Sequence, residues 1–308
     1  MAEQRRGVMP PVHRPPERPS KRTVRTRRLV AALAFLVVVG AGVGIAFAAT
    51  DRGGGSAAPA TTASPPPPKP LRIVFPEGFT LAQMAQRITA VDGIARRKRH
   101  VRPKLRAAQF LKLTRDARFP PGFGHRRGKL EGFLFPATYD FLKATTTKQL
   151  VVDQLQAFEQ NWHRLNLAYA RSKHLTPYDV LIIASMVEKE ALAPDERPLV
   201  ASVIYNRLRA GMPLGIDATL RYGLNIPGTE SIHESQLHNP TPYNTRLHTG
   251  LPPTPIANPG LASLQAAAHP RRTDYLYFVR KPDKVHHFFT ASSSEFLRKE
   301  CEYGYGCG

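Results

Sequence analysis

Apolar and polar positions along the chain predict a long apolar segment, then a short mixed region, then a helix-rich region. Residues 29–49 form an unbroken apolar run. Residues 72–75 have the pattern of a short strand, and Thr80 is a suitable N-cap for a helix whose apolar positions are Leu81, Met84, Ala85 and Ile88. A second helix is predicted over 106–116, and the alternation in 130–141 indicates a strand and a turn around Pro136.

From residue 141 onward the apolar spacing is helical. Helices are predicted over 145–165 and 196–211, the second ending at Gly211. The segment 239–260 is rich in proline and predicts loops, followed by a helix from Leu261 and a strand pair over 274–281 and 284–290. The elements together predict an α+β protein.

The helix that begins near Pro177 has the clearest start. Thr176 is placed as its N-cap, Pro177 as its first residue, and Asp179 in its first turn. Because positions 180–187 contain almost no polar residue, this helix has no polar face and is expected to be buried on all sides. It nevertheless ends in Glu188 and Glu190.

The long apolar run at residues 29–49 is predicted to place the two ends of the chain on opposite sides of a membrane. Its 21 residues carry no charge, and about 20 apolar residues are enough to cross a bilayer. A cleavable signal peptide is the competing interpretation, but its apolar core is usually only ~7–15 residues long. We expect an uncleaved single-pass anchor in the plasma membrane, with the arginine-rich N-terminus cytoplasmic and the remainder extracytoplasmic.

The predicted organisation therefore has five parts. They are a basic cytoplasmic tail (1–28), a transmembrane helix (29–49), a Gly/Ser/Pro linker (50–70), a small α+β module (71–140) and a larger helix-rich α+β domain (141–308).

The charge of the chain is strongly basic but unevenly distributed. The formal net charge is +21, and much of the excess lies in the N-terminal tail and in the basic run 96–106. No zinc-finger spacing, RNP-like strand or recognition helix accompanies it, so nucleic acid is not the expected partner. Of the two cysteines, Cys301 and Cys307, both lie at the C-terminal end. They fit either a small disulfide in an oxidising compartment or two free thiols, and two ligands are too few for a metal site.

Glu188 and Glu190 are the candidate chemical groups. A carboxyl group in apolar surroundings has a raised pKa, which suits a general acid. A solvated helix end would contain the same residues. Two residues apart on a helix, their side chains point roughly 200° apart, so the pattern does not choose between them.

The surrounding motifs carry a resemblance to a known family. The segments SMVEKEAL, VASVIYNRL, GMPLGIDATLRYGL and YNTRLHTGLPPTPIANPGLASLQAAAHP occur in this order. The chain resembles the YceG-like endolytic murein transglycosylases through most of 71–300, and 71–140 looks like that family's LysM-like subdomain. The resemblance implies a membrane-anchored lyase that cuts the MurNAc–GlcNAc bond inside peptidoglycan strands and leaves 1,6-anhydro-MurNAc ends.

The same resemblance supplies expectations for the site. It implies Glu188 as the catalytic acid and then base, and Asn206, Asp217, Tyr243, Asn244 and Thr245 as residues that bind substrate. No cofactor or metal is needed, because the muramic acid's own 6-hydroxyl replaces water.

Each of these residues also has a structural interpretation. Asp217 suits the N-cap of a helix from Ala218, Asn206 suits a buried structural amide, and Tyr243 and Asn244 suit turn formation. Two histidines, His286 and His287, fit the family's H-x-F strand in different registers.

The expected partners are peptidoglycan strands, the cytoplasmic membrane and peptidoglycan synthases. The alternative to an enzyme is a non-catalytic protein that binds the cell wall and recruits the synthesis machinery.

Overall fold

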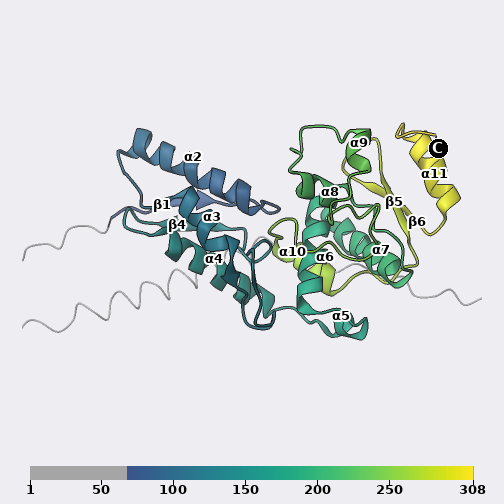
Figure 1. The fold of residues 1–308 in the computed structure, drawn as a ribbon, viewed down its shortest axis with the longest axis horizontal. Coiled ribbons are helices and arrows are strands. Elements are labelled where there is room, and N and C mark those ends of the chain that lie inside the picture. The colour runs from purple at the N-terminus through teal and green to yellow at the C-terminus, as the bar shows by residue number, and fades with distance from the viewer. Residues whose placement is uncertain (1–67, 308) are drawn as a thin grey trace, which may run out of the picture. The chain divides into compact units, whose positions relative to one another are not determined.

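The computed structural model describes residues 68–307, which form ten α-helices, one short 3-10 helix and three two-stranded sheets (Figure 1). The mixed α+β class predicted from the sequence is confirmed for this part of the chain. In order, the elements are β1 (Leu71–Val74), α2 (Leu81–Arg99), α3 (Ala107–Arg115), β2 (Ala117–Arg118), β3 (Arg127–Gly128), β4 (Thr138–Phe141), α4 (Thr147–Trp162), α5 (Ala168–Ser172), α6 (Pro177–Glu190), η1 (Pro194–Glu196), α7 (Arg197–Arg209), α8 (Asp217–Leu224), α9 (Glu234–Leu237), α10 (Leu261–Ala268), β5 (Tyr277–Arg280), β6 (His287–Thr290) and α11 (Ser293–Glu302).

The predicted transmembrane helix at 29–49 lies outside the described residues. Within 68–307 no helix combines the length and the apolar character that a membrane crossing requires.

The first part of the described chain is built on an antiparallel pair of strands. Strand β1 pairs with β4, with Ile73 opposite Tyr139, and α2 and α3 lie between these strands in the sequence. Helix α2 starts as predicted, because the Thr80 hydroxyl accepts a hydrogen bond from the Gln83 amide while the Gln83 side chain accepts one from the Thr80 amide. The predicted strand and turn over 130–141 is correct only at its end. Residues 130–137 form turns, and regular pairing begins at Thr138.

An aromatic core joins this part of the chain to α4. The rings of Phe133 and Phe158 lie 5.3 Å apart, and those of Phe123 and Trp162 lie 4.8 Å apart. Aromatic pairs at this separation stabilise a core beyond the burial of their area. Figure 1 shows α2, α3 and α4 grouped with the β1–β4 pair.

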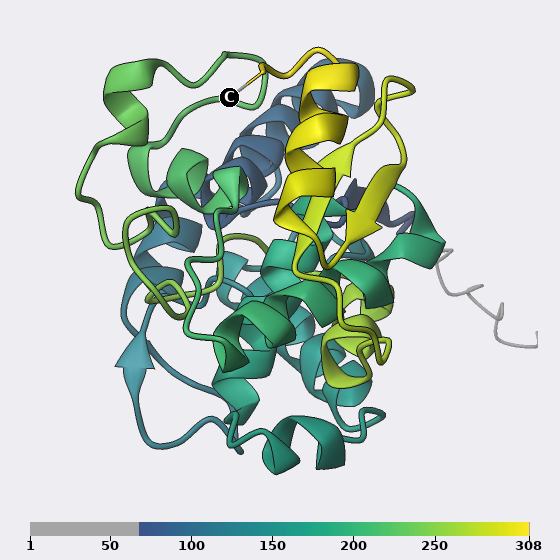
Figure 2. The same ribbon diagram turned by 90° about the vertical axis from the view of Figure 1, so that its right-hand side faces the viewer.

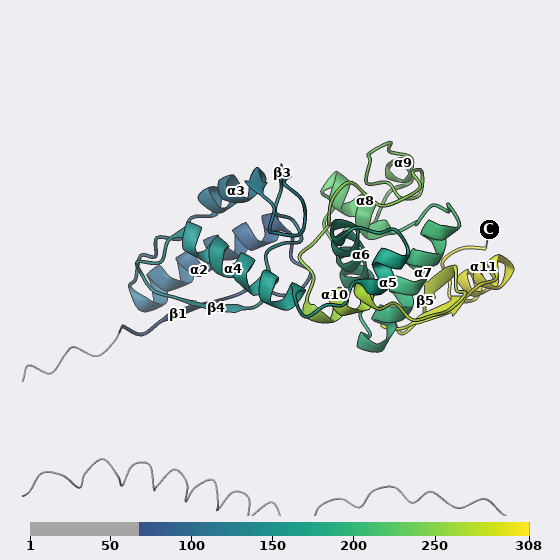
Figure 3. The ribbon, with the colours of Figure 1, turned by 90° about the horizontal axis from the view of Figure 1, so that it is seen from below.

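Helix α6 is the centre of the second part. Thr176 and Asp179 form the predicted capping box, with Pro177 as the first helical residue, and every residue from Val180 to Val187 is buried. Burial on all sides is therefore confirmed. Helices α7, α8 and α10 pack around it, and Figure 3 shows α10 beside α6. The Ser185 hydroxyl in this helix accepts a hydrogen bond from the Ile256 amide at 3.0 Å, which fixes the loop before α10.

Asn258 in that loop connects the two parts. Its side-chain oxygen accepts hydrogen bonds from the amides of Gly132 and Leu134, both at 3.0 Å, and its side-chain nitrogen donates to the Phe79 carbonyl at 2.9 Å. Asn258 is completely buried. A buried polar group that loses its partner lowers the stability of the fold. These bonds therefore fix the position of the loop relative to the first part of the described chain.

The end of the described chain is a strand pair covered by a helix. Strands β5 and β6 pair antiparallel as predicted, and α11 packs on both (Figure 2). Cys301 and Cys307 form a disulfide, which resolves the two interpretations that the sequence left open.

Candidate active site

A large cleft of about 1710 Å³ lies between the N-terminal end of α2, the C-terminal end of α6, helix α8, and the β5–β6–α11 unit. Its polar and charged walls bring together residues from segments far apart in the sequence. They include Glu131, Glu190, Arg207, Asp217, Tyr222, Tyr243, Arg246, Arg280, His287 and Glu300. A cleft lined by carboxylates, guanidinium groups and tyrosines suits a polar, extended ligand.

Glu190, the last residue of α6, faces this cleft. Burial raises the pKa of its carboxyl group to about 7, and the nearby charge of Asp217 raises it further, whereas Arg280 opposes the shift. A carboxyl group with this pKa is partly protonated near neutral pH. It can therefore both donate and accept a proton near neutral pH.

Glu188, the predicted catalytic residue, has different surroundings. Its side chain does not line the cleft, and its Oε2 accepts a hydrogen bond from the Gly260 amide at 3.0 Å, at the start of α10. Burial raises the pKa of Glu188 as well, but the Gly260 bond opposes this. Glu190 therefore lines the cleft and Glu188 does not, because the two side chains leave α6 in different directions. The catalytic role of Glu188 stays a prediction.

Asp217 and Arg246 form a charged pair in the cleft. The Asp217 carboxylate accepts two hydrogen bonds from the Arg246 guanidinium, at 2.9 and 2.6 Å. Asp217 is the first residue of α8, and its side chain makes no capping bond, because the N-cap is Ile216. The alternative interpretation of Asp217 as the cap of a helix from Ala218 is therefore wrong.

Asn244 and Thr245 are brought near the cleft but act within the loop itself. The Asn244 side chain donates to the carbonyls of Leu237 and Asn239 at 2.8 and 2.9 Å. Thr245 accepts from the Ile216 amide at 3.0 Å, and neither residue is exposed beyond 2%. Their bonds hold the loop so that its neighbours Tyr243 and Arg246 line the cleft.

Tyr243 belongs to a tyrosine pair backed by a buried acid. Its ring lies 5.2 Å from that of Tyr222, and its hydroxyl is 2.8 Å from the Thr254 hydroxyl. The Tyr222 hydroxyl donates to Glu131 at 3.0 Å. Glu131 also accepts bonds from the Leu81 amide and the Asn258 side chain, at 3.0 and 2.9 Å. This network sets the position of Tyr222 in the wall of the cleft.

Asn206 lies away from the cleft. Its side chain donates to the carbonyls of Thr273 and Tyr275, both at 2.9 Å, and joins α7 to the segment before β5. The structural interpretation of Asn206 as a buried amide fits these contacts, and its role in binding substrate stays a prediction.

The two histidines separate clearly. His287 is buried in β6 and contacts Glu196 at 2.7 Å through Nδ1, whereas His286 is half-exposed and contacts Asp283. Burial lowers the pKa of His287, and the Glu196 bond opposes this. Only His287 lines the cleft. In the described part of the chain, no three His, Cys, Asp or Glu side chains are grouped to hold a metal ion.

Glu131, Tyr222 and Arg246 are site residues that the sequence interpretation did not select. Glu131 had a detectable signal, because it is a lone acid inside the apolar stretch LEGFLF. Tyr222 lies five positions after the selected residue Asp217, and Arg246 lies directly after the selected residue Thr245. Nothing in the sequence around Tyr222 or Arg246 indicates that the two residues line the same cleft.

Comparison with known proteins gives three results. The model of the YceG-like family matches residues 57–302. The chain is 31% identical to the endolytic murein transglycosylase of Streptococcus pneumoniae strain R6 over 75% of this chain and 44% of that protein. It is 34% identical to that of Bacillus subtilis over 68% of this chain and 59% of that protein. The chain thus spans about half the length of these curated relatives.

Among solved structures, a YceG-like protein from Listeria monocytogenes superposes with a TM-score of 0.60 at 31% identity, covering 74% of this chain and 75% of that one. None of these matches names a LysM module, so that assignment for 71–140 stays a prediction. Because the family model matches well over half of the sequence, the chain belongs to the YceG-like family.

Proposed function

We propose that this protein is an endolytic murein transglycosylase that cleaves the MurNAc–GlcNAc bond within peptidoglycan strands, with Glu190 as the acid and then the base. The observation that carries the proposal is the position of Glu190, a carboxyl group with a pKa of about 7 in the wall of a 1710 Å³ cleft. The names of the curated relatives supply the reaction.

The chemistry needs only one carboxyl group. Glu190 protonates the glycosidic oxygen as the bond from C1 of the muramic acid breaks. The muramic acid's 6-hydroxyl oxygen then bonds to C1, and its proton passes to the Glu190 carboxylate. The product carries a 1,6-anhydro ring, no water is consumed, and Glu190 recovers its proton.

The remaining cleft residues supply charge and orientation. The carboxylate of Asp217 lies close enough to Glu190 to raise its pKa, and it can stabilise positive charge at C1 while Arg246 holds it in place. Tyr222 and Tyr243 present ring surface to the sugars, while their hydroxyls bond to Glu131 and Thr254. Holding a strand against these fixed groups lowers the entropic barrier to the ring closure.

We choose Glu190 rather than Glu188 because of where their oxygens are directed. The Glu188 carboxylate accepts a hydrogen bond from the Gly260 amide at 3.0 Å, and the same glycine lies against the Glu77 side chain. Glu188 thus fixes the start of α10 to the end of α6. A backbone amide also lies against each carboxyl group, Gly260 for Glu188 and Ala218 for Glu190, so the choice rests on the cleft, which Glu190 lines and Glu188 does not.

Localisation and partners follow from the sequence alone. Residues 29–49 would anchor the protein in the plasma membrane, with the cleft on the extracytoplasmic side. There it would reach new strands and could contact peptidoglycan synthases.

The test is mass analysis of the products of purified glycan strands digested with the full-length chain. Wild type should release ends with the mass of 1,6-anhydro-MurNAc, Glu190→Gln should abolish release, and Glu188→Gln should retain it. Loss in Glu188→Gln with retention in Glu190→Gln would transfer the catalytic role to Glu188.

Two other results would change the reaction itself. Reducing ends would identify a hydrolase and contradict the mechanism without water. Tight binding of strands with no product over long incubation would favour the non-catalytic wall-binding protein.

A further inference from the structure

We infer that the disulfide-closed C-terminal loop holds Tyr305 as a saccharide-binding subsite on the cleft, separate from the catalytic acid. The inference deepens the proposed function and rests on it. It gives a role to the terminal sequence CEYGYGCG, which the reaction does not require.

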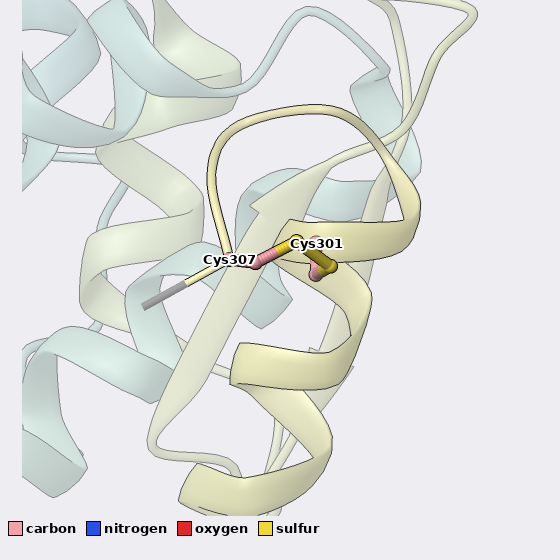
Figure 4. The surroundings of a disulfide bond; sticks show 2 residues. All are labelled: Cys301 and Cys307. Atoms are coloured by element: carbon pink, nitrogen blue, oxygen red, sulfur yellow. A yellow bond between two sulfur atoms is a disulfide. The ribbon is translucent and has the colours of Figure 1, made fainter.

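The loop is built to hold one conformation. Helix α11 ends at Glu302, and the Cys301–Cys307 disulfide closes a short ring directly after it (Figure 4). Two backbone bonds reinforce the ring, from Gly304 to the Cys301 carbonyl at 3.1 Å and from Tyr305 to the Glu300 carbonyl at 2.9 Å.

Tyr305 stands between two glycines with left-handed backbone. Gly304 has φ of 80° and Gly306 has φ of 125°, conformations that other residues rarely adopt. The chain therefore turns sharply on both sides of a single aromatic side chain.

The tyrosine in this ring is not a core residue. Its side chain is 54% exposed and lines the cleft, together with Glu300 and Phe296 of α11. Tyr303, two residues earlier, contacts the Lys299 ammonium group beside α11.

Polar groups from other segments line the same cleft as Tyr305. Arg246 attracts the charge of Glu300, which indicates that α11 faces the loop that carries Arg246. Gly228 and Thr229, which follow α8, also line the cleft.

These features fit an N-acetylated pyranose. One face of such a ring consists of C–H bonds and packs on an aromatic ring, and its hydroxyl and amide groups bond to charged or polar neighbours. Tyrosine offers a large contact area at little entropic cost, and an already constrained loop reduces that cost further. Because Tyr305 lies on α11's side and Glu190 on α6, the subsite would bind a sugar of the same strand outside the bond that is cleaved.

The subsite predicts a dependence on strand length. Removing the aromatic side chain of Tyr305 should weaken binding of long strands about 3- to 10-fold. Binding of short fragments should not change, because only long strands reach the subsite. Reduction of the disulfide should have the same direction of effect, because the loop then samples other conformations. In the active enzyme KM should rise while kcat is unchanged.

The experiment measures binding by calorimetry, using the full-length chain with Glu190→Gln and glycan strands freed of stem peptides. Long and short strand fractions are compared for this protein, for the same protein with Tyr305→Ala, and for a matched control with Tyr303→Ala. A third variant, Cys301→Ser with Cys307→Ser, removes the disulfide and tests whether the closed loop is needed for binding.

The expected result is weaker binding of long strands with Tyr305→Ala and with the double serine variant, but not with Tyr303→Ala. Unchanged affinity for long strands with Tyr305→Ala would overturn the subsite while leaving the proposed function intact. Absence of strand binding even with Tyr305 present would overturn both, so the two failures are distinguishable.

Discussion

The buried carboxyl group of Glu131 should make the folded protein less stable as the pH rises from 5 to 8. Only 3% of this residue is exposed, and burial raises its pKa from 4.5 to about 7 although three groups donate hydrogen bonds to it. The folded protein therefore holds this proton between pH 4.5 and 7, whereas the unfolded chain releases it. The contribution to stability is fully present below pH 4.5 and is lost as the pH rises through about 7.

The size of the effect follows from the two pKa values. The difference between 4.5 and about 7 corresponds to about 3 kcal/mol of unfolding free energy, at 1.36 kcal/mol per pKa unit. Glu190 has a pKa raised to the same value and contributes in the same direction. Replacing Glu131 with Gln removes its titration, so the variant should lose about 3 kcal/mol less than wild type between pH 5 and pH 8.

Urea unfolding at pH 5, 6, 7 and 8 measures this slope. Trp162 is the single tryptophan, is 9% exposed and packs in the aromatic core, so its fluorescence reports unfolding directly. Glu230→Gln changes an exposed glutamate and serves as the control, with the slope of wild type expected. A Glu131→Gln protein whose stability falls with pH as steeply as wild type would refute the reasoning, whatever its stability at a single pH.

Further predictions concern the acid, the connecting amide and one glycine. The pKa of Glu190 is about 7 and its protonated form starts the reaction. The kcat/KM measured on glycan strands should therefore fall about tenfold per pH unit above pH 7. A flat profile to pH 9 would contradict the assignment of Glu190 as the acid. Asn258→Ala leaves several buried groups without partners and should cost at least about 3 kcal/mol in urea unfolding; a loss below 1 kcal/mol would refute this. Gly132→Ala places a methyl group 2.7 Å from Pro255 at a φ of 89° and should cost more than about 2 kcal/mol, whereas Gly122→Ala, at a φ of 88° in open space, should cost only about 1 kcal/mol. Equal losses for the two glycines would mean that the contact with Pro255 is not a constraint.

Local features of the fold were predictable where neighbouring residues determine them. Thr80 and Thr176 begin helices because each side chain bonds to an amide three residues later, and that partner is visible in the sequence. The burial of α6 followed equally directly from its lack of a polar face.

The site was less predictable because distant segments decide which residues face the cleft. Glu188 and Glu190 stand two residues apart at the end of the same helix, and the contacts with α8 and α10 distinguish their surroundings. Asn244 and Thr245 are polar residues in a matching motif, yet nearby backbone groups satisfy their bonds. A sequence shows which polar residues are present but not which ones already have partners.

The bonds of Asn258 also have a consequence for the order of folding. Gly132 precedes this residue by 126 positions, and Phe79 precedes it by 179. At a synthesis rate of about 5–20 residues per second, Gly132 waits roughly 6 to 25 s for its partner. Throughout that interval the amides of Gly132 and Leu134 must remain hydrated, so the region around them cannot close early. The cleft is complete later still, because Arg280, His287 and Glu300 in its wall follow Asn258 in the chain.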